Sequence, residues 1–189
     1  MPKGPAALHF TGDPEADALL AADPLALLIG FALDQQVTVQ SAFAGPLKLK
    51  QRLGSLGATT IAATDPDRLL EIFRERPAIH RFPGSMATRV QELCAFVAEE
   101  YGGDAAQLWT KAKDTADLKK RIGALPGYGP MKITALGSVL ALRFGVAIAD
   151  PLVPPHACLG AVDSPQALAD YQAKKRADKA TRRAQAGTS

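Results

Sequence analysis

Cysteine, aromatic residues and long apolar runs are all scarce in this sequence of 189 residues. The two cysteines, Cys94 and Cys158, are too few for a disulfide framework or for a metal site with four thiolate ligands. No apolar run reaches the roughly 18 to 20 residues that a membrane-spanning helix needs. The residues after Met1 lack the apolar region of a secretory signal. We therefore expect a cytoplasmic protein without a membrane segment.

Apolar residues make up 47% of the chain, enough for a hydrophobic core, whereas aromatic residues contribute only 6%. Aliphatic side chains and alanine must therefore fill most of that core. Alanine and leucine favour helices, and runs of β-branched residues are few. The sequence also lacks internal repeats, coiled-coil heptads and a β-hairpin pattern. An all-α protein is therefore predicted.

Positive charge is concentrated at one end of the chain. Residues 166–189 contain six lysines and arginines against two aspartates, a net charge of +4, so the preceding residues carry −1 of the overall +3. A basic tail of this kind is typical of an arm that contacts a polyanion. It is equally typical of a solvated terminal helix that keeps a protein in solution.

Turn and capping residues divide the chain into helical segments. Asp23-Pro24 and Asp65-Pro66 are expected helix starts, because aspartate caps a helix N-terminus and proline fits its first position. Ser85 is the expected N-cap of a later helix, and Gly45-Pro46 is expected to bend or split another. The first helix is expected to pack with the C-terminal segment. The predicted helices cover residues 1–22, 25–33, 42–53, 66–76, 86–101, 115–124 and 131–144, and a loop is predicted over 151–165.

The most informative segment joins the helices predicted at 115–124 and 131–144 through Leu125-Pro126-Gly127-Tyr128-Gly129. Gly127 and Gly129 can adopt positive φ and leave backbone N–H groups uncovered. Together with the N-terminus of the second helix, these donors would form a site for a phosphate, with a monovalent cation bridging. Such a contact positions DNA without reading its bases. A plain tight turn is the alternative.

The stretch from Leu125 to Asp150, LPGYGPMKITALGSVLALRFGVAIAD, resembles the helix-hairpin-helix (HhH-GPD) DNA glycosylase superfamily. Two upstream segments, LDQQVT at 33–38 and FPGSMA at 82–87, are similar to the family's glutamine-containing turn and small-residue loop. The resemblance is to the endonuclease III and 3-methyladenine glycosylase II branches. It implies a two-lobed helical glycosylase domain over 1–165, with the hairpin at 115–144, followed by a basic tail over 166–189.

The resemblance implies a monomeric enzyme of base excision repair that acts on double-stranded DNA containing a damaged or modified base. It would extrude that base and hydrolyse its N-glycosidic bond. Asp150 is the implied catalytic residue, because a carboxylate can stabilise an oxocarbenium-like sugar and deprotonate the attacking water. Gln36 is implied to fill the space that the base leaves. Deaminated or 5-substituted pyrimidines and alkylated purines are both candidate substrates.

The resemblance also implies which other residues contact DNA or line the base pocket. The expected DNA contacts are Gln36, Leu125, Gly127, Gly129, Lys132 and Arg81, and the expected base pocket holds Asp34, Gln35 and Met131. Structural roles stay open for several of them. Asp150 could cap the turn before Pro151, and the two glutamines could satisfy backbone groups at a helix end.

One departure from the family pattern concerns strand cleavage. Family members that also cut the strand carry a lysine two positions after the last glycine of the hairpin, where it forms a Schiff base with the sugar. Met131 stands there, and Lys132 follows it. Adjacent residues on a helix point about 100° apart. Met131 is therefore expected as a pocket wall and Lys132 as a phosphate contact or solvated residue, which predicts a monofunctional glycosylase.

A second departure is the missing cysteine cluster. Relatives with an iron–sulfur cluster have four cysteines after the aspartate, whereas only Cys158 lies beyond Asp150. Neither an iron–sulfur cluster nor another metal is expected. Two rival functions remain, a catalytically inactive protein that binds DNA structures and a glycosylase with lyase activity through Lys132. The expected location is the bacterial cytoplasm, in association with the nucleoid.

Overall fold

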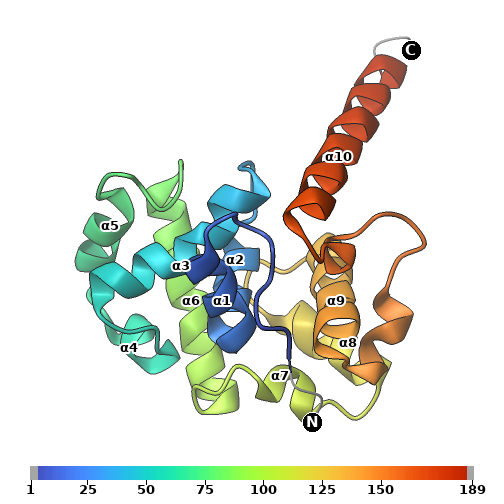
Figure 1. Ribbon diagram of the computed structural model, residues 1–189. Coiled ribbons are helices and arrows are strands. Elements are labelled where there is room, and N and C mark those ends of the chain that lie inside the picture. Colours follow the sequence, from blue (N-terminus) through green and yellow to red (C-terminus); the bar gives the residue numbers. More distant parts are fainter. Residues whose placement is uncertain (1–3, 187–189) are drawn as a thin grey trace.

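The computed structural model describes residues 4–186, and within that range every regular element is a helix (Figure 1). The predicted all-α class is therefore confirmed. No single helix in this range is long and apolar enough to cross a membrane, although the bent pair α1 and α2 passes the same test when taken together. The elements are α1 (Pro14–Ala22), α2 (Pro24–Leu33), α3 (Val39–Leu53), α4 (Ala58–Ala63), α5 (Pro66–Arg74), α6 (Pro83–Tyr101), α7 (Gln107–Thr110), α8 (Thr115–Ala124), α9 (Pro130–Phe144), the 3₁₀ helices η1 (Ala147–Leu152) and η2 (Leu159–Ala161), and α10 (Pro165–Ala186).

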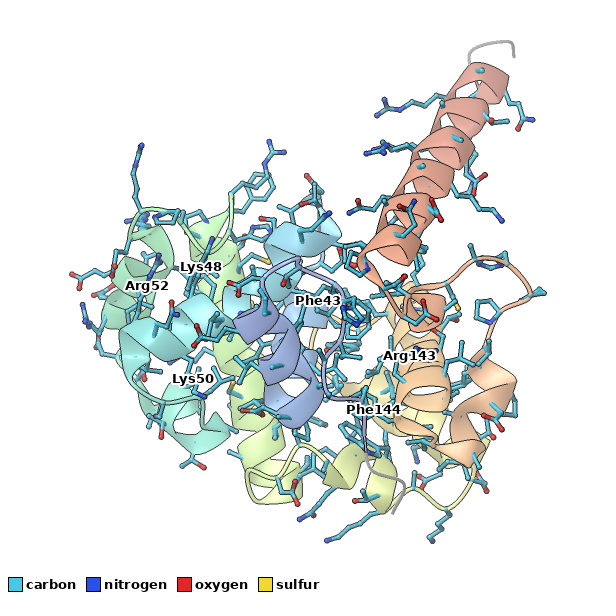
Figure 2. All side chains as sticks on the ribbon, viewed as in Figure 1. Phe43, Lys48, Lys50, Arg52, Arg143 and Phe144 are labelled. Atoms are coloured by element: carbon cyan, nitrogen blue, oxygen red, sulfur yellow. The ribbon has the colours of Figure 1, made fainter. Side chains whose placement is uncertain are left out.

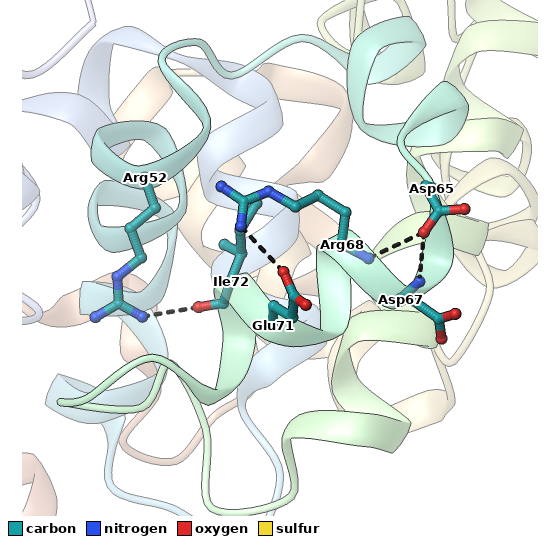
Figure 3. Close-up of polar contacts among 6 residues, drawn as sticks. All are labelled: Arg52, Asp65, Asp67, Arg68, Glu71 and Ile72. Carbon is teal, nitrogen blue, oxygen red and sulfur yellow. Dashed lines mark hydrogen bonds and ion pairs between the residues drawn. The ribbon is translucent and has the colours of Figure 1, made fainter.

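Aspartate caps, which the sequence predicts, and left-handed glycines set several of these boundaries. The carboxylate of Asp23 accepts hydrogen bonds from the first free amides of α2, and Asp65 does the same for α5 (Figure 3). Gly54, Gly102 and Gly145 end α3, α6 and α9 with φ values of 87°, 58° and 65°. These are left-handed conformations in which glycine avoids a Cβ clash.

In the first group of helices, α1 to α6, the helices α1, α3 and α6 pack on α2, and α4 and α5 pack on α6. All residues of α2 after Pro24 are buried. On its outer side, the ring of Phe43 lies edge-on to Phe10 and Phe31, with centroids 5.1 and 5.0 Å away. Gly30 permits this approach, because a Cβ there would lie 2.4 Å from Phe43 Cδ1. The resulting core holds the C-terminal end of α2 in a fixed position.

The side chain of Arg52, near the end of α3, fastens that helix to α5 and the segment after it (Figure 3). Its guanidinium donates hydrogen bonds of 2.9, 2.9 and 2.7 Å to the carbonyl oxygens of Ile72, Glu75 and Pro77. The arginine side chain is only 10% exposed. These bonds therefore brace the α3–α5 side of the first group, far from α10.

The second group is built around α9, against which η1 and η2 pack. A Cβ at Gly137 would lie 2.6 Å from Leu152, so η1 lies directly on α9. The backbone N–H of Gly160 donates to Ser138 Oγ at 3.2 Å, which places η2 on the same helix. Tyr128 joins the two groups, because its hydroxyl donates to the carbonyl oxygen of Leu28 at 2.6 Å.

The N-terminal prediction is wrong in the described residues. The first helix begins at Pro14, where Asp13 caps it, and residues 4–13 are not helical. Residues 1–3 of the predicted helix lie outside the described residues. α1 packs on α2 and α3 rather than on the C-terminal segment. The preceding chain instead crosses to the second group, where Gly4 lies against the ring of Phe144 (Figure 2).

Two other boundaries differ for packing reasons. α3 is one helix with Pro46 inside it, and Gly45 fits closely on α2, since a Cβ there would lie 2.4 Å from Leu33 Cδ1. Ser85 is not an N-cap, because α6 already begins at Pro83, whose fixed φ suits a first helical position. The segment expected as a loop over 151–165 contains the short helix η2, and the basic tail continues as α10 to Ala186.

Candidate functional site

Leu125 to Gly129 join α8 to α9, and the two glycines of this hairpin segment differ. Gly127 has a φ of 78°, a left-handed conformation, whereas Gly129 has an extended φ of −95° and is the N-cap of α9. No side chain caps the first amides of α9. Leu125 is buried, so its side chain packs in the core and only its backbone could meet DNA. The exposed part of the hairpin is Gly127, Gly129 and the start of α9.

Arg89, from α6, connects this hairpin to the glutamine turn that follows α2. Its side chain lies beside the exposed Gly127, where a Cβ would be 3.0 Å from Arg89 Cδ and Nε. Its guanidinium also donates a hydrogen bond to Gln35 Oε1. The structure thus brings together two segments that are nearly a hundred residues apart. The sequence gives no signal for this role of Arg89. The arginine lies between the hairpin and the glutamine turn only because of how α6 packs.

The glutamine turn projects Gln36 from the surface. Gln36 is exposed and has a φ of 57°, and no other residue except glycine has a positive φ in the described chain. A left-handed conformation costs a non-glycine residue about 1 kcal/mol or more. The buried His80 connects this turn to the segment before α6. Its Nδ1 accepts a hydrogen bond from the N–H of Phe82 at 3.0 Å, and its Nε2 donates one to the carbonyl oxygen of Leu33 at 3.1 Å. The turn therefore has a strained, well-supported geometry.

Met131 and Lys132 lie in different environments, as their adjacent positions on a helix predict. Met131 is 83% exposed, whereas Lys132 is half-buried and turns toward α2. Its ammonium group donates to the carbonyl oxygen of Ala32 at 3.3 Å and lies 5.5 Å from the centroid of the Tyr128 ring. Burial, and then the charge of Arg89, lower the pKa of Lys132. The expectation of a solvated Lys132 is therefore wrong, because the hairpin is tilted onto α2.

Asp34, the C-cap of α2, faces this lysine from the other side of the turn. Burial raises the pKa of its carboxyl, and Lys175 and Lys132 oppose that shift. Within residues 4–186 the carboxylate accepts no hydrogen bond and forms no ion pair. Asp34 is therefore a half-buried acid without a hydrogen-bond donor in the described range, and the charges of two lysines act on its pKa.

The basic helix α10 stands beside this cluster and rises away from the body (Figure 1). The side-chain amides of Gln172 and Gln40 hydrogen-bond each other, which ties α10 to α3. Beyond Gln172 every described residue of α10 is exposed. One side of α10 borders a hollow of about 680 Å³ and the other a hollow of about 850 Å³, and Lys175 and Lys179 line both.

We name these two surfaces the α9 hollow and the glutamine hollow. The α9 hollow is lined by Met131, His156, Ala157, Tyr171, Lys174, Lys175, Asp178, Lys179, Thr181 and Arg182. The glutamine hollow is lined by Gln36, Val37, Thr38, Val39, Ser41, Arg81, Gln172, Lys175, Arg176 and Lys179. Met131 is thus part of a pocket wall, and Arg81 and Gln36 share one surface.

Asp150 is not brought to this surface. It lies in η1, which packs mainly on α8 and α9, to the right of α9 in Figure 1 and away from α2. Its side chain is exposed, has no hydrogen bond or ion pair within the described range, and lines neither hollow. The chain returns to the start of α9 only at His156 and Ala157. The close contact of η1 with Gly137, which no local sequence pattern reveals, determines this path.

The cysteines and other metal-ligating residues form no metal site in the described part of the chain. No group of three or more His, Cys, Asp or Glu side chains could hold a metal ion there. Cys94 is a core residue, as predicted, and burial raises the pKa of its thiol to about 12.

No protein-family model matches this chain, and a search of curated proteins finds no match. The function is therefore inferred from the residues and their geometry.

Proposed function

We propose that this protein binds duplex DNA and hydrolyses the N-glycosidic bond of a damaged base that it extrudes. The observation that supports the proposal most is that the hairpin, the glutamine turn and the basic helix α10 lie next to one another on one surface. Arg89 links the first two, and Lys175 of α10 borders both hollows. In the sequence these features are separate, so their convergence is independent support for the resemblance.

The hairpin and α10 would hold the DNA backbone. Backbone amides at an uncapped helix N-terminus attract phosphate oxygens, and Gly127 exposes its own backbone beside them. The cations of α10 would bind further phosphates and release counterions, which makes binding dependent on salt. These contacts supply affinity without sequence preference.

Gln36 is the residue proposed to enter the base stack. Its long side chain is exposed and lines the glutamine hollow, and His80 and Arg89 hold the turn through hydrogen bonds. A side chain inserted into a duplex must hold its place while the displaced nucleotide rotates outward. A rigid turn serves that purpose better than a flexible loop.

Two rival functions each have one observation in their favour. The exposed position of Asp150, apart from both hollows, favours a DNA-binding protein without catalysis. The lowered pKa of Lys132 favours a lyase, because a neutral amine can attack the sugar C1′ and form a Schiff base.

A panel of duplex oligonucleotides separates these functions. Each duplex carries one deaminated, 5-substituted or alkylated base, and the products are analysed with and without alkali. Strand cuts only after alkali support the proposed hydrolysis, and cuts without alkali, together with trapping by borohydride, support the lyase. Binding of duplex DNA with no base released from any substrate supports the binding protein. Absence of DNA binding at low salt would refute all three.

A further inference from the structure

A third hollow, of about 420 Å³, lies between the end of α5 and the start of α6, and we name it the arginine hollow. Three arginines and, among the described residues, no acidic side chain line it. All three arginines are exposed, and within residues 4–186 none forms an ion pair or a side-chain hydrogen bond. The lining residues are Arg74, Arg76, Pro77, Ala78, His80, Arg81 and Pro83.

The absence of acidic partners distinguishes these arginines from others in the body of the protein. The ion pairs of the described chain are formed by Arg52, Arg68 and Arg121. Glu75, the acid between Arg74 and Arg76 in the sequence, has its Oε1 3.5 Å from Arg52 Nε and does not line the hollow. Three like charges around one space repel one another, and an anion bound among them would remove that repulsion.

The side chain of Arg52 holds the wall of the arginine hollow in place. Its guanidinium binds the carbonyl oxygens of Ile72, Glu75 and Pro77, the first of which Figure 3 shows. These bonds fix the segment that carries Arg74 and Arg76, and the charge of Arg52 offsets the negative potential of the carbonyl groups. The wall is therefore both rigid and electropositive.

The start of α6 adds to the positive potential of the arginine hollow. Pro83, the first residue of this 19-residue helix, lines the hollow, and no side chain caps the first amides of the helix. Uncapped amides at a helix N-terminus attract anions. The guanidinium carbon of Arg81 lies 4.9 Å from the centroid of the Phe82 ring, a cation–π contact that restricts the arginine side chain.

The arginine hollow adjoins the glutamine hollow. Arg81 lines both of them, and Gln36 lines the second. In Figure 1 the chain between α5 and α6 (green) rises on one side of the glutamine turn, and α10 (red) rises on the other. Cationic side chains therefore flank Gln36 on two sides, and a duplex lying across the glutamine turn would meet both groups of charges.

We propose that the arginine hollow binds backbone phosphates of a DNA duplex on the side of Gln36 opposite to α10. This proposal rests on the duplex binding in the proposed function and concerns the positioning of DNA, not the removal of a base. Phosphodiesters fit the hollow because a guanidinium group can bind two phosphate oxygens at once, and phosphates recur along the strand. Contacts on two sides would keep the duplex in place while Gln36 occupies the base stack.

The test compares the full-chain double variant Arg76→Gln, Arg81→Gln with the charge-matched control Lys50→Gln, Lys119→Gln. The control lysines are exposed on α3 and α8 and do not line the arginine hollow. Fluorescence anisotropy of a labelled, undamaged duplex at several potassium chloride concentrations gives the slope of log affinity against log salt. If each arginine contacts one phosphate, the slope of the variant should be shallower than that of the control by about 1.8. Arg76→Lys, Arg81→Lys keeps both charges and should keep the parental slope.

Two further measurements separate positioning from other roles. If the arginine hollow and α10 hold the same duplex, adding Lys179→Gln and Arg182→Gln to the glutamine variant should make the slope shallower by about 3.6 in total relative to the parent. In single turnover with saturating enzyme, on the substrate found with the oligonucleotide panel, the glutamine variant should release the base at the parental rate. It should also unfold at the parental temperature, because both arginines are exposed and lack ion pairs in the described chain.

Each other outcome has a defined meaning. Equal slopes for the glutamine variant and its control would show that the arginine hollow does not contact DNA, and the proposed function would stand. A lower unfolding temperature together with loss of binding in the lysine variant would make the arginines structural and overturn the proposal. A slower release at saturation would assign them to the reaction and also overturn it. A parent that binds no duplex at low salt refutes this proposal and the proposed function together, whereas the expected slopes without base release support the hollow and refute the glycosylase.

Discussion

The cationic face of α10 should set the salt dependence of DNA binding. Lys179 and Arg182 are exposed and line the α9 hollow, and neither contacts the hydrophobic core. Replacing both by glutamine should therefore change the free energy of unfolding by less than about 0.5 kcal/mol. If each contacts one phosphate, the slope of log affinity against log salt should become shallower by about 1.8. Over a fourfold rise in salt, the parent should then lose about 12-fold more affinity than the variant.

Fluorescence anisotropy of a labelled, undamaged duplex at several potassium chloride concentrations measures this slope. The matched control replaces Lys50 and Arg68, which are exposed residues of α3 and α5, by glutamine. Lys50 lies on the side of the molecule away from α10 (Figure 2). The control removes the same net charge, so a purely global effect of charge would change both slopes equally. Equal slopes in the two double variants would refute a specific role of α10.

Three further predictions concern the scaffold that holds this surface. Arg52→Ala should lower the free energy of unfolding by about 2 kcal/mol, because three carbonyl oxygens lose a charged donor; an unchanged urea midpoint would contradict this. Gly30→Ala should cost about 1–3 kcal/mol or more, because its Cβ would lie 2.4 Å from Phe43, whereas Gly84→Ala, whose Cβ has room, should cost far less in the same assay. Burial lowers the pKa of His80 below 6.5, so the unfolded chain takes up a proton at a higher pH than the folded chain. The unfolding temperature should accordingly fall as the pH drops below 6.5 toward the folded pKa, and His80→Gln should flatten this dependence; an identical pH profile would show that His80 does not titrate on unfolding.

Local chemistry was sufficient to predict much of the helical framework. Asp23 and Asp65 cap the helices that follow them because the capping bond is made within three residues, and Gly54 and Gly102 end theirs for an equally local reason. A bend or break at Pro46 was expected, but α3 is one helix. Its close packing onto α2 outweighs the one backbone hydrogen bond that the proline removes.

The orientation of the site depends on contacts that no local pattern encodes. Lys132 faces inward because Tyr128 and Lys132 itself bond to carbonyl oxygens of α2, a hundred residues away. Helical spacing correctly separated Met131 from Lys132, but it could not say which of them faces α2. The place of Asp150 depends likewise on how η1 packs against Gly137.

The departures from local rules are themselves informative, because three of them gather at one point. Asp34 puts a negative charge at a helix C-terminus, Gln36 is left-handed without being glycine, and Lys132 is half-buried without an ion pair in the described chain. A left-handed residue other than glycine costs about 1 kcal/mol or more, and a half-buried cation without an ion pair is also unfavourable. Four other aspartates, Asp13, Asp23, Asp65 and Asp114, are helix N-caps, and the other left-handed positions of the described chain are glycines. Concentrated strain of this kind is typical of a site kept for function rather than stability. It therefore supports the proposed role of the glutamine turn independently of the resemblance.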